Sequence, residues 1–168
     1  MSHSFTVACV QTTTGPDVAA NLKQTTDLIR DAHQSGAQLI ILPEVVNVLD
    51  MDRKALAQKL SIETEDASLI AFCDLARDLK VWILIGSLAL HHETAKKNDG
   101  HPKFANRSFL IDDTGSICST YTKIHLFDVD LGNGESYHES STYEPGDQAV
   151  IADTPWGKLG MTICYDLR

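Results

Sequence analysis

In the first part of the chain, the spacing of apolar and polar positions predicts strands and helices in alternation. Residues 5–11 form a short apolar run, which predicts a buried strand. Apolar positions recur at helical spacing across residues 18–32, with Asp17 as the expected N-cap and Gly36 as the expected stop. A second, nearly continuous apolar run follows at residues 37–42. This strand–helix–strand order predicts a crossover connection onto a buried parallel sheet.

The same helix and strand pattern recurs once more before the predicted elements become shorter. Apolar positions at helical spacing from Leu69 to Leu79 predict a second helix, and residues 81–90 predict a third buried strand. Shorter apolar runs separated by turn residues then predict shorter strands, at residues 104–112, 117–121, 149–153 and 158–164. The sequence at residues 112–115 (DDTG) is typical of a hairpin turn between the first two of these strands.

Two stretches carry no regular pattern. Residues 91–103 are polar and predict an exposed, mobile loop, whereas residues 122–146 are long and interrupted by glycines and by Glu144-Pro145-Gly146. Long ordered loops in compact domains are usually functional, so the second stretch is a candidate part of a site. No linker or shift in composition divides the chain, and we expect one α/β domain over residues 1–168.

Composition narrows the class of partner. The 168 residues include 14 basic and 23 acidic side chains, and the formal net charge of −9 argues against nucleic acid because phosphate binding needs clustered Lys and Arg. No apolar run is long enough to span a membrane, and the N-terminus lacks the pattern of a signal peptide. The four cysteines show no paired spacing. We therefore expect a reduced, cytoplasmic protein with no nucleic-acid or membrane partner.

Three reactive side chains share one context, because each lies where a predicted apolar strand ends. Glu44 follows the run at residues 37–42, Lys123 follows the strand that ends at Tyr121, and Cys164 ends the last predicted strand. Ligands of open α/β sheets bind at the carboxyl ends of the strands. The sequence therefore predicts that a carboxylate, an ammonium and a thiol meet at one place.

Such a set of groups can carry out nucleophilic catalysis. A cysteine thiol of ordinary pKa is only about 3% ionised at neutral pH, so it needs a base or a nearby positive charge. A buried carboxylate can take the thiol proton, and an ammonium beside the sulfur favours the thiolate and can stabilise an oxyanion. Each residue alone has an ordinary alternative, namely a buried apolar cysteine at position 164, a solvated carboxylate at position 44 and a surface cation at position 123.

Three segments of the sequence resemble the signature segments of the nitrilase superfamily, the carbon–nitrogen hydrolases. They are Leu42-Pro43-Glu44, residues 121–128 (YTKIHLFD) and residues 162–168 (TICYDLR), and their order and separation also match. The resemblance runs through nearly the whole chain, from residues 8–11 (ACVQ) onward. It implies an α/β fold of the nitrilase type, an α-β-β-α sandwich, of which residues 1–168 are the N-terminal portion.

The resemblance also implies a role for each residue that matches a family motif. Cys164 would be the nucleophile that forms a thioester, and Glu44 the general base that later acts as an acid. Lys123 would stabilise the tetrahedral intermediates. Glu139 matches the second glutamate of the family, which positions the substrate and the catalytic groups. The backbone N–H of Tyr165 is a candidate oxyanion donor.

Residues 123–140 resemble the Nit branch of the superfamily most closely, and within it the deaminated glutathione amidases. This implies an enzyme that hydrolyses the side-chain amide of a small-molecule α-keto acid and releases ammonia, and we expect no cofactor and no metal. Omega-amidases and N-carbamoyl hydrolases are the alternatives within the enzyme class. A cation that binds the substrate carboxylate is expected, but the sequence does not assign it.

Members of the superfamily continue past the position of Arg168, through strands and helices that complete the sandwich and its dimer interface. We expect a homodimer in the full-length form, and we expect this chain alone to be inactive or to aggregate because its sheet is uncovered. The alternative function is a non-catalytic truncated fragment or binding remnant. Retention of Glu44, Lys123, Glu139 and Cys164 together favours the enzyme.

The histidines are interpreted as structural residues rather than as metal ligands or catalytic groups. Adjacent His91 and His92 would point to opposite faces of a strand, which does not suit a metal site. His125 could pair with Cys164 in a papain-like dyad, but its context favours a structural, hydrogen-bonded role.

The remaining polar and sulfur groups are also interpreted as structural. Asp166 and Arg168 are expected to brace the turn after the nucleophile as an ion pair. Cys9, Cys73 and Cys118 are expected at core-facing positions, where a thiol is inert.

Overall fold

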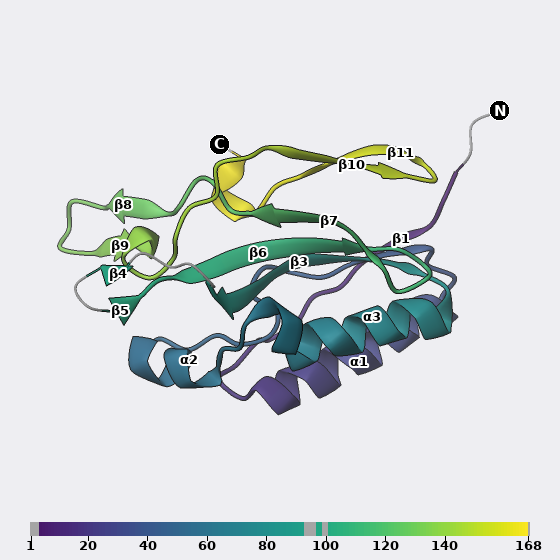
Figure 1. Cartoon of the computed structure of the whole chain (residues 1–168), viewed down its shortest axis with the longest axis horizontal. Helices are drawn as coiled ribbons and strands as arrows, with labels where there is room; N and C mark the ends of the chain where they lie inside the picture. The colour runs from purple at the N-terminus through teal and green to yellow at the C-terminus, as the bar shows by residue number, and fades with distance from the viewer. Residues whose placement is uncertain (1–3, 93–96, 99–100, 168) are drawn as a thin grey trace.

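The computed structural model describes residues 4–92, 97–98 and 101–167, and its centre is a five-stranded mixed sheet (Figure 1). The strand order is β1-β2-β3-β6-β7, with parallel pairing from β1 to β3 and antiparallel pairing from β3 to β7. The strands are β1 Val7–Cys9, β2 Leu39–Ile41, β3 Trp82–His91, β6 Phe104–Ile111 and β7 Ile117–Thr122. The predicted crossover and the predicted hairpin are both confirmed.

Two long helices cover one face of this sheet, α1 Val18–Gln34 and α3 Ala67–Leu79, as the apolar spacing predicts. Asp17 is the N-cap of α1 and accepts a hydrogen bond from the Ala20 N–H, and Gly36 adopts a φ of 86° just beyond its end. A third helix, α2 Arg53–Lys59, was not predicted. It has seven residues and buries one side chain, Leu56, which is too little to set an amphipathic pattern.

The layers follow from where apolar side chains are buried. One cluster fills the space between the helices and the sheet, and Ile40, Ile83 and Phe109 are at its centre with no exposed surface. The other face of the sheet carries a smaller cluster beneath a hairpin of β10 Val150–Thr154 and β11 Gly157–Met161 (Figure 1). The α/β class is confirmed.

The predicted irregular stretch at residues 122–146 is wrong in part, because it contains short regular elements. These are β8 Asp128–Asp130, β9 Ser136–His138 and the 3-10 helix η2 Glu139–Ser141. The other predicted loop, residues 91–103, lies partly outside the described residues. Its described part includes β4 Lys97–Asn98 and β5 His101–Pro102, which pair antiparallel.

The prediction that β1 is buried is wrong, and so is the prediction that Cys9 and Cys118 face the core. Val7 is 40% exposed, both of these cysteines are exposed, and Cys73 is half-buried. The physical reason is position, because β1 and β7 are the edge strands of the five-stranded sheet. No helix among the described residues is both long and apolar enough to cross a membrane.

Candidate functional site

Glu44 stands just beyond the end of β2, where the chain passes closely over β3. Gly86 in β3 lies at the contact, and a Cβ atom there would be 2.3 Å from the Leu42 carbonyl oxygen and 2.5 Å from the Pro43 carbonyl carbon. Glycine is needed because no side chain fits between the two backbones. The pairing of β3 with β6 shifts register at the same point, as expected for a β-bulge.

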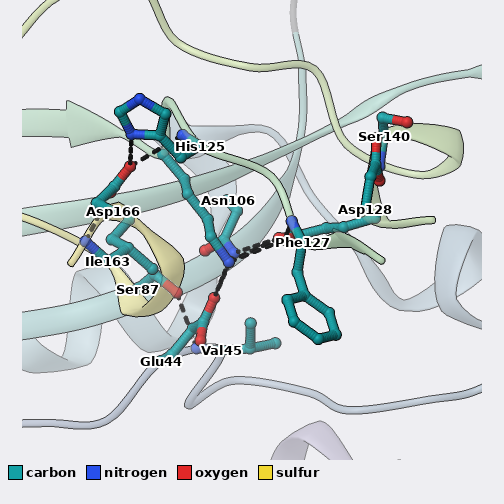
Figure 2. A network of polar contacts seen from close by, with 12 residues as sticks. Glu44, Val45, Ser87, Asn106, His125, Phe127, Asp128, Ser140, Ile163 and Asp166 are labelled. Atoms are coloured by element: carbon teal, nitrogen blue, oxygen red, sulfur yellow. Dashed lines mark hydrogen bonds and ion pairs between the residues drawn. The ribbon is translucent and has the colours of Figure 1, made fainter. Parts of the chain in front are cut away.

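The next residue, Val45, is held in a costly conformation. Its φ of 49° lies in the left-handed region, which a β-branched residue rarely adopts. The Val45 N–H donates to the Ser87 hydroxyl at 2.8 Å (Figure 2), and the Val46 N–H donates to the Ser87 carbonyl at 3.0 Å. Two bonds to a buried residue of the central strand therefore fix the direction in which Glu44 projects.

Lys123 follows β7 and is the most deeply buried cation of the site, with 2% of its surface exposed. Its ammonium donates to Glu44 Oε1 at 2.9 Å and contacts Glu139 Oε1 at 3.0 Å and Oε2 at 2.9 Å. Burial opposes the charged form, but the hydrogen bonds and charges of the two carboxylates outweigh it and raise the pKa of Lys123. The lysine therefore stays charged between two glutamates.

Asn106, which binds two carboxylates of this cluster, is a residue that the sequence analysis did not select as a candidate. Its side-chain amide nitrogen donates to Glu44 Oε1 at 2.8 Å and to Glu139 Oε1 at 3.2 Å (Figure 2). Its backbone carbonyl also accepts from the Lys123 N–H at 3.0 Å. The indication in the sequence was an amide side chain within the predicted strand of β6. Asn106 is buried there, and a buried polar group needs hydrogen-bond partners.

Glu139 enters the cluster from η2, outside the central sheet. Besides Lys123 and Asn106, it accepts from the Phe127 backbone N–H, at 2.7 Å to Oε2. Both of its carboxylate oxygens are therefore occupied. Glu44 differs, because both of these side-chain donors reach its Oε1 and neither reaches its Oε2.

Cys164 follows β11 and begins the 3-10 helix η3 Cys164–Asp166. Its φ of 45° is again a left-handed value in a residue with a side chain. Burial, the charge of Glu44 and a hydrogen bond to Glu44 raise the pKa of the Cys164 thiol, and the opposing charge of Lys123 is too weak to reverse this. The lysine acts in the expected direction, because its charge lowers the pKa of the thiol.

Asp166 braces the turn that presents Cys164, but by other contacts than those predicted. It accepts from the Ile163 N–H at 2.9 Å, from the Tyr121 hydroxyl at 2.6 Å and from the His125 N–H at 2.9 Å. The His125 ring also lies within hydrogen-bond distance, with Nδ1 2.9 Å from Asp166 Oδ1 (Figure 2). The predicted partner, Arg168, lies outside the described residues. The structural role predicted for His125 is confirmed.

The candidate groups open onto one cavity of about 510 Å³. Glu44, Lys123, Glu139 and Cys164 all line it, so the structure brings together the four side chains that the sequence analysis selected. The other lining residues are mostly apolar or aromatic: Val45, Leu49, Asn106, Phe127, Tyr137, His138 and Tyr143. A second cavity of about 230 Å³ lies on the other side of Glu44 and Cys164.

Tyr165, whose backbone N–H is the predicted oxyanion donor, lies in η3 directly after Cys164. Its ring packs edge-on against Phe127, with the ring centroids 5.3 Å apart. This contact joins the turn of the thiol to the segment that binds Glu139. Among the described residues, no group of three or more His, Cys, Asp and Glu side chains is arranged to hold a metal ion.

Comparison with known proteins places this geometry in context. A family model described as carbon-nitrogen hydrolase matches residues 6–168. The chain is 36% identical over 164 residues to a deaminated glutathione amidase of Yersinia enterocolitica, covering 96% of this chain and 54% of that protein. It is 34% identical over 174 residues to the omega-amidase NIT3 of Saccharomyces cerevisiae, covering 100% of this chain and 57% of that protein. The chain thus spans about half the length of these curated relatives.

Solved structures share the fold. The C. elegans NitFhit protein superposes with a TM-score of 0.78 at 28% identity, over 96% of this chain and 38% of that chain. Nit3 of Saccharomyces cerevisiae, described as a member of branch 10 of the nitrilase superfamily, superposes with a TM-score of 0.75 at 27% identity, over 95% of this chain and 55% of that chain. The predicted nitrilase-type fold is confirmed.

Proposed function

This chain belongs to the carbon-nitrogen hydrolase family, and on that premise we propose that it carries the catalytic groups of a cysteine-dependent amidase. Cys164 is the nucleophile, Glu44 the general base, Lys123 the cation beside the reacting carbonyl and Glu139 the group that positions Lys123. The observation that carries the proposal is that these four side chains meet at one cavity. A thiol, a base and a fixed cation at one place are the parts that acyl transfer requires.

The reaction starts from the neutral thiol, because the pKa of Cys164 is raised. As the sulfur forms a bond to the amide carbon, its proton passes to Glu44. Lys123 and Asn106 both bind Oε1 of this carboxylate, so Oε2 is the oxygen that accepts the proton. Catalysis thus relies on a base in contact with the thiol rather than on a preformed thiolate.

The proton then moves on to the leaving group. The carbon–nitrogen bond breaks as Glu44 protonates the nitrogen, ammonia leaves, and the acyl group stays on Cys164 as a thioester. Water that gives a proton to Glu44 adds to the thioester carbon. The carbon–sulfur bond breaks, the proton returns to the sulfur, and the products are a carboxylic acid and the original thiol. One water is consumed for each ammonia released.

Two groups stabilise the oxyanion of each tetrahedral intermediate in this proposal. Lys123 acts through its charge, which its two carboxylate partners keep in place. The backbone N–H of Tyr165, directly after the nucleophile, is the second group. Loss of one oxyanion donor typically costs about 100- to 1,000-fold in rate.

Glu139 is a poor candidate for the base, although it is as close to Lys123 as Glu44 is. Its two oxygens already accept from Lys123, from Asn106 and from the Phe127 N–H. No oxygen is left to receive a proton from the thiol. The asymmetry between the two carboxylates supports the division of roles.

We propose the side-chain amide of an α-keto acid, such as deaminated glutathione, as the substrate. The names of the two curated relatives support this class, since one is a deaminated glutathione amidase and the other an omega-amidase. Val45, Leu49 and Phe127 give the cavity apolar walls that suit the methylene chain of such an acid. Omega-amidase substrates belong to the same chemical class, and N-carbamoyl compounds are the competing class.

The test is ammonia release by the intact protein. Cys164→Ala removes the nucleophile and is expected to reduce release by several orders of magnitude without changing the fold. Cys118→Ala is the matched control, because this thiol is exposed on an edge strand and should leave the rate unchanged. A panel of α-keto amides, carbamoyl compounds and nitriles identifies the class. Undiminished ammonia release by Cys164→Ala would overturn the assignment.

A further inference from the structure

The cavity beside Cys164 holds a tyrosine hydroxyl that no hydrogen bond between described residues uses. The ammonium of Lys123 and the amide of Asn106 donate to the two carboxylates of the site. The Tyr137 hydroxyl donates to Glu135. Tyr143 lines the same cavity, and its hydroxyl has no such partner within the part of the chain that the structure describes. It is a donor available to a bound molecule.

The structure fixes the Tyr143 ring in place. Its backbone N–H donates to the Glu139 carbonyl at 2.9 Å, and residue 143 forms an isolated bridge with Phe104. The ring packs edge-on against Phe104, with centroids 6.3 Å apart and planes 74° apart, and joins a buried cluster that includes Val48 and Leu56. A hydroxyl on a fixed ring loses little freedom on binding a ligand, so its hydrogen bond is effective.

The chemical state of this hydroxyl is also defined. Burial, and then the negative charges of Glu139 and Glu44, raise the pKa of Tyr143 well above its ordinary value. The phenol is therefore neutral and carries its proton at neutral pH. It can donate a hydrogen bond to an anion without adding negative charge to a site that already has two carboxylates.

We propose that the Tyr143 hydroxyl donates a hydrogen bond to the carboxylate of the substrate, and that this contact selects monoamides of dicarboxylic acids over simple amides. The inference rests on the proposed amidase function and deepens it. Tyr143 is a specificity-determining residue in this proposal, because the reacting carbonyl and the leaving nitrogen are handled by Cys164, Lys123 and Glu44.

The Tyr143 hydroxyl donates to the carboxylate of the acyl chain rather than to the leaving nitrogen, and the reason is which hydrogen-bonding groups the cavity leaves without a partner. A leaving –NH₂ group offers N–H donors, and the cavity already contains a carboxylate acceptor for them in Glu44. A substrate carboxylate instead needs donors, and the N–H groups of Lys123 and Asn106 are engaged. His138 also lines the cavity, but it lies at an exposed position, opposite Asp128 in the β8–β9 pair.

The experiment compares two amides of equal chain length in the intact protein. Glutaramate, the monoamide of glutaric acid, carries the terminal carboxylate, and pentanamide carries a methyl group in its place. Tyr143→Phe removes the hydroxyl and keeps the ring that packs on Phe104. We expect KM for glutaramate to rise about tenfold with kcat nearly unchanged, the loss typical of one hydrogen bond to a charged acceptor. KM for pentanamide should not change.

Tyr137→Phe is the matched control, because its hydroxyl is bonded to Glu135. It should leave the preference between the two amides unchanged. An equal change of KM for both amides in Tyr143→Phe, or no change for either, overturns this inference while the amidase assignment stands. Failure of the wild-type protein to release ammonia from either amide overturns this inference, and failure on the α-keto amides of the panel as well overturns the proposed function together with it.

Discussion

The four groups of the site are held in two different ways. Glu44 and Lys123 extend from the ends of β2 and β7, where strand pairing and burial in the five-stranded sheet fix the backbone. Glu139 and Cys164 lie on the 3-10 helices η2 and η3, outside that sheet, and individual hydrogen bonds fix their positions. The proposed base and the cation thus extend from the sheet, whereas the proposed nucleophile and the second glutamate belong to turns.

This difference has a consequence for how the site responds to mutation. A change on the sheet side disturbs packing and pairing, so stability and activity fall together. A change on the turn side removes one brace of a short segment, so the geometry of the nucleophile is lost at a smaller cost in stability. Lys123 joins the two sides, because it binds one carboxylate from each.

Lys123→Met removes the cation that links the two sides, and it is expected to have the largest effect on stability and activity. It leaves Glu44 and Glu139 close together without their cation, and breaking a buried pair in this way costs about 3–5 kcal/mol of stability. Urea unfolding at neutral pH measures the loss, and ammonia release should be abolished. The loss should shrink in acid, where a carboxylate can bind a proton in place of the missing charge.

Lys158→Met is the control for that variant. Lys158 also pairs with a carboxylate, Asp153 at 2.7 Å, but the two side chains are 71% and 84% exposed. Exposed pairs contribute about 0–1 kcal/mol, so the unfolding free energy should barely change. Equal unfolding midpoints for Lys123→Met and Lys158→Met would show that the lysine does not join the two sides.

Asp166→Asn weakens the turn side alone. Burial by itself would raise the pKa of Asp166, but hydrogen bonds from Tyr121, the Ile163 N–H and His125 outweigh it and hold the pKa below its ordinary value. A depressed pKa in the folded state stabilises the fold above the unfolded value, about 3.9, and this contribution disappears as the pH falls through the folded-state value. The free energy of unfolding of wild type should therefore exceed that of Asp166→Asn by about 1–2 kcal/mol near pH 6. The difference should become progressively smaller below about pH 4.

Unfolding curves between pH 6 and pH 2 measure this difference, and ammonia release at neutral pH should fall by more than the stability change alone explains. Asp153→Asn, on the exposed hairpin, is the control and should show no such pH dependence. A difference between wild type and Asp166→Asn that grows in acid would contradict the proposed bracing of η3.

The sheet side is also the part of the molecule that the sequence predicts well. A continuous apolar run before Glu44 and a short strand pattern before Lys123 predict strands, and the ends of strands in one sheet fall near one another. On the turn side, Cys164 was selected because it ends a predicted strand. Glu139 was selected only through the resemblance of its motif, because residues 122–146 are polar and rich in turn residues and their short β8–β9 pair has no apolar period. Asn106 was missed because a polar residue in a strand gives no indication of which buried groups it will bind.

Ser87→Ala, the smallest expected effect, tests the sheet side by one hydrogen bond. Ser87 is fully buried, and its hydroxyl accepts from the N–H of Val45, the strained residue next to Glu44. Alanine leaves that N–H without its acceptor, which should lower the free energy of unfolding by about 1 kcal/mol. It should also lower kcat, because the orientation of the Glu44 side chain is held less firmly. Ser68→Ala is the matched control, because the buried Ser68 hydroxyl has no hydrogen-bond partner among the described residues. Its removal should leave the unfolding free energy unchanged or raise it, and equal losses in the two variants would mean that the Ser87 bond does not hold Glu44 in place.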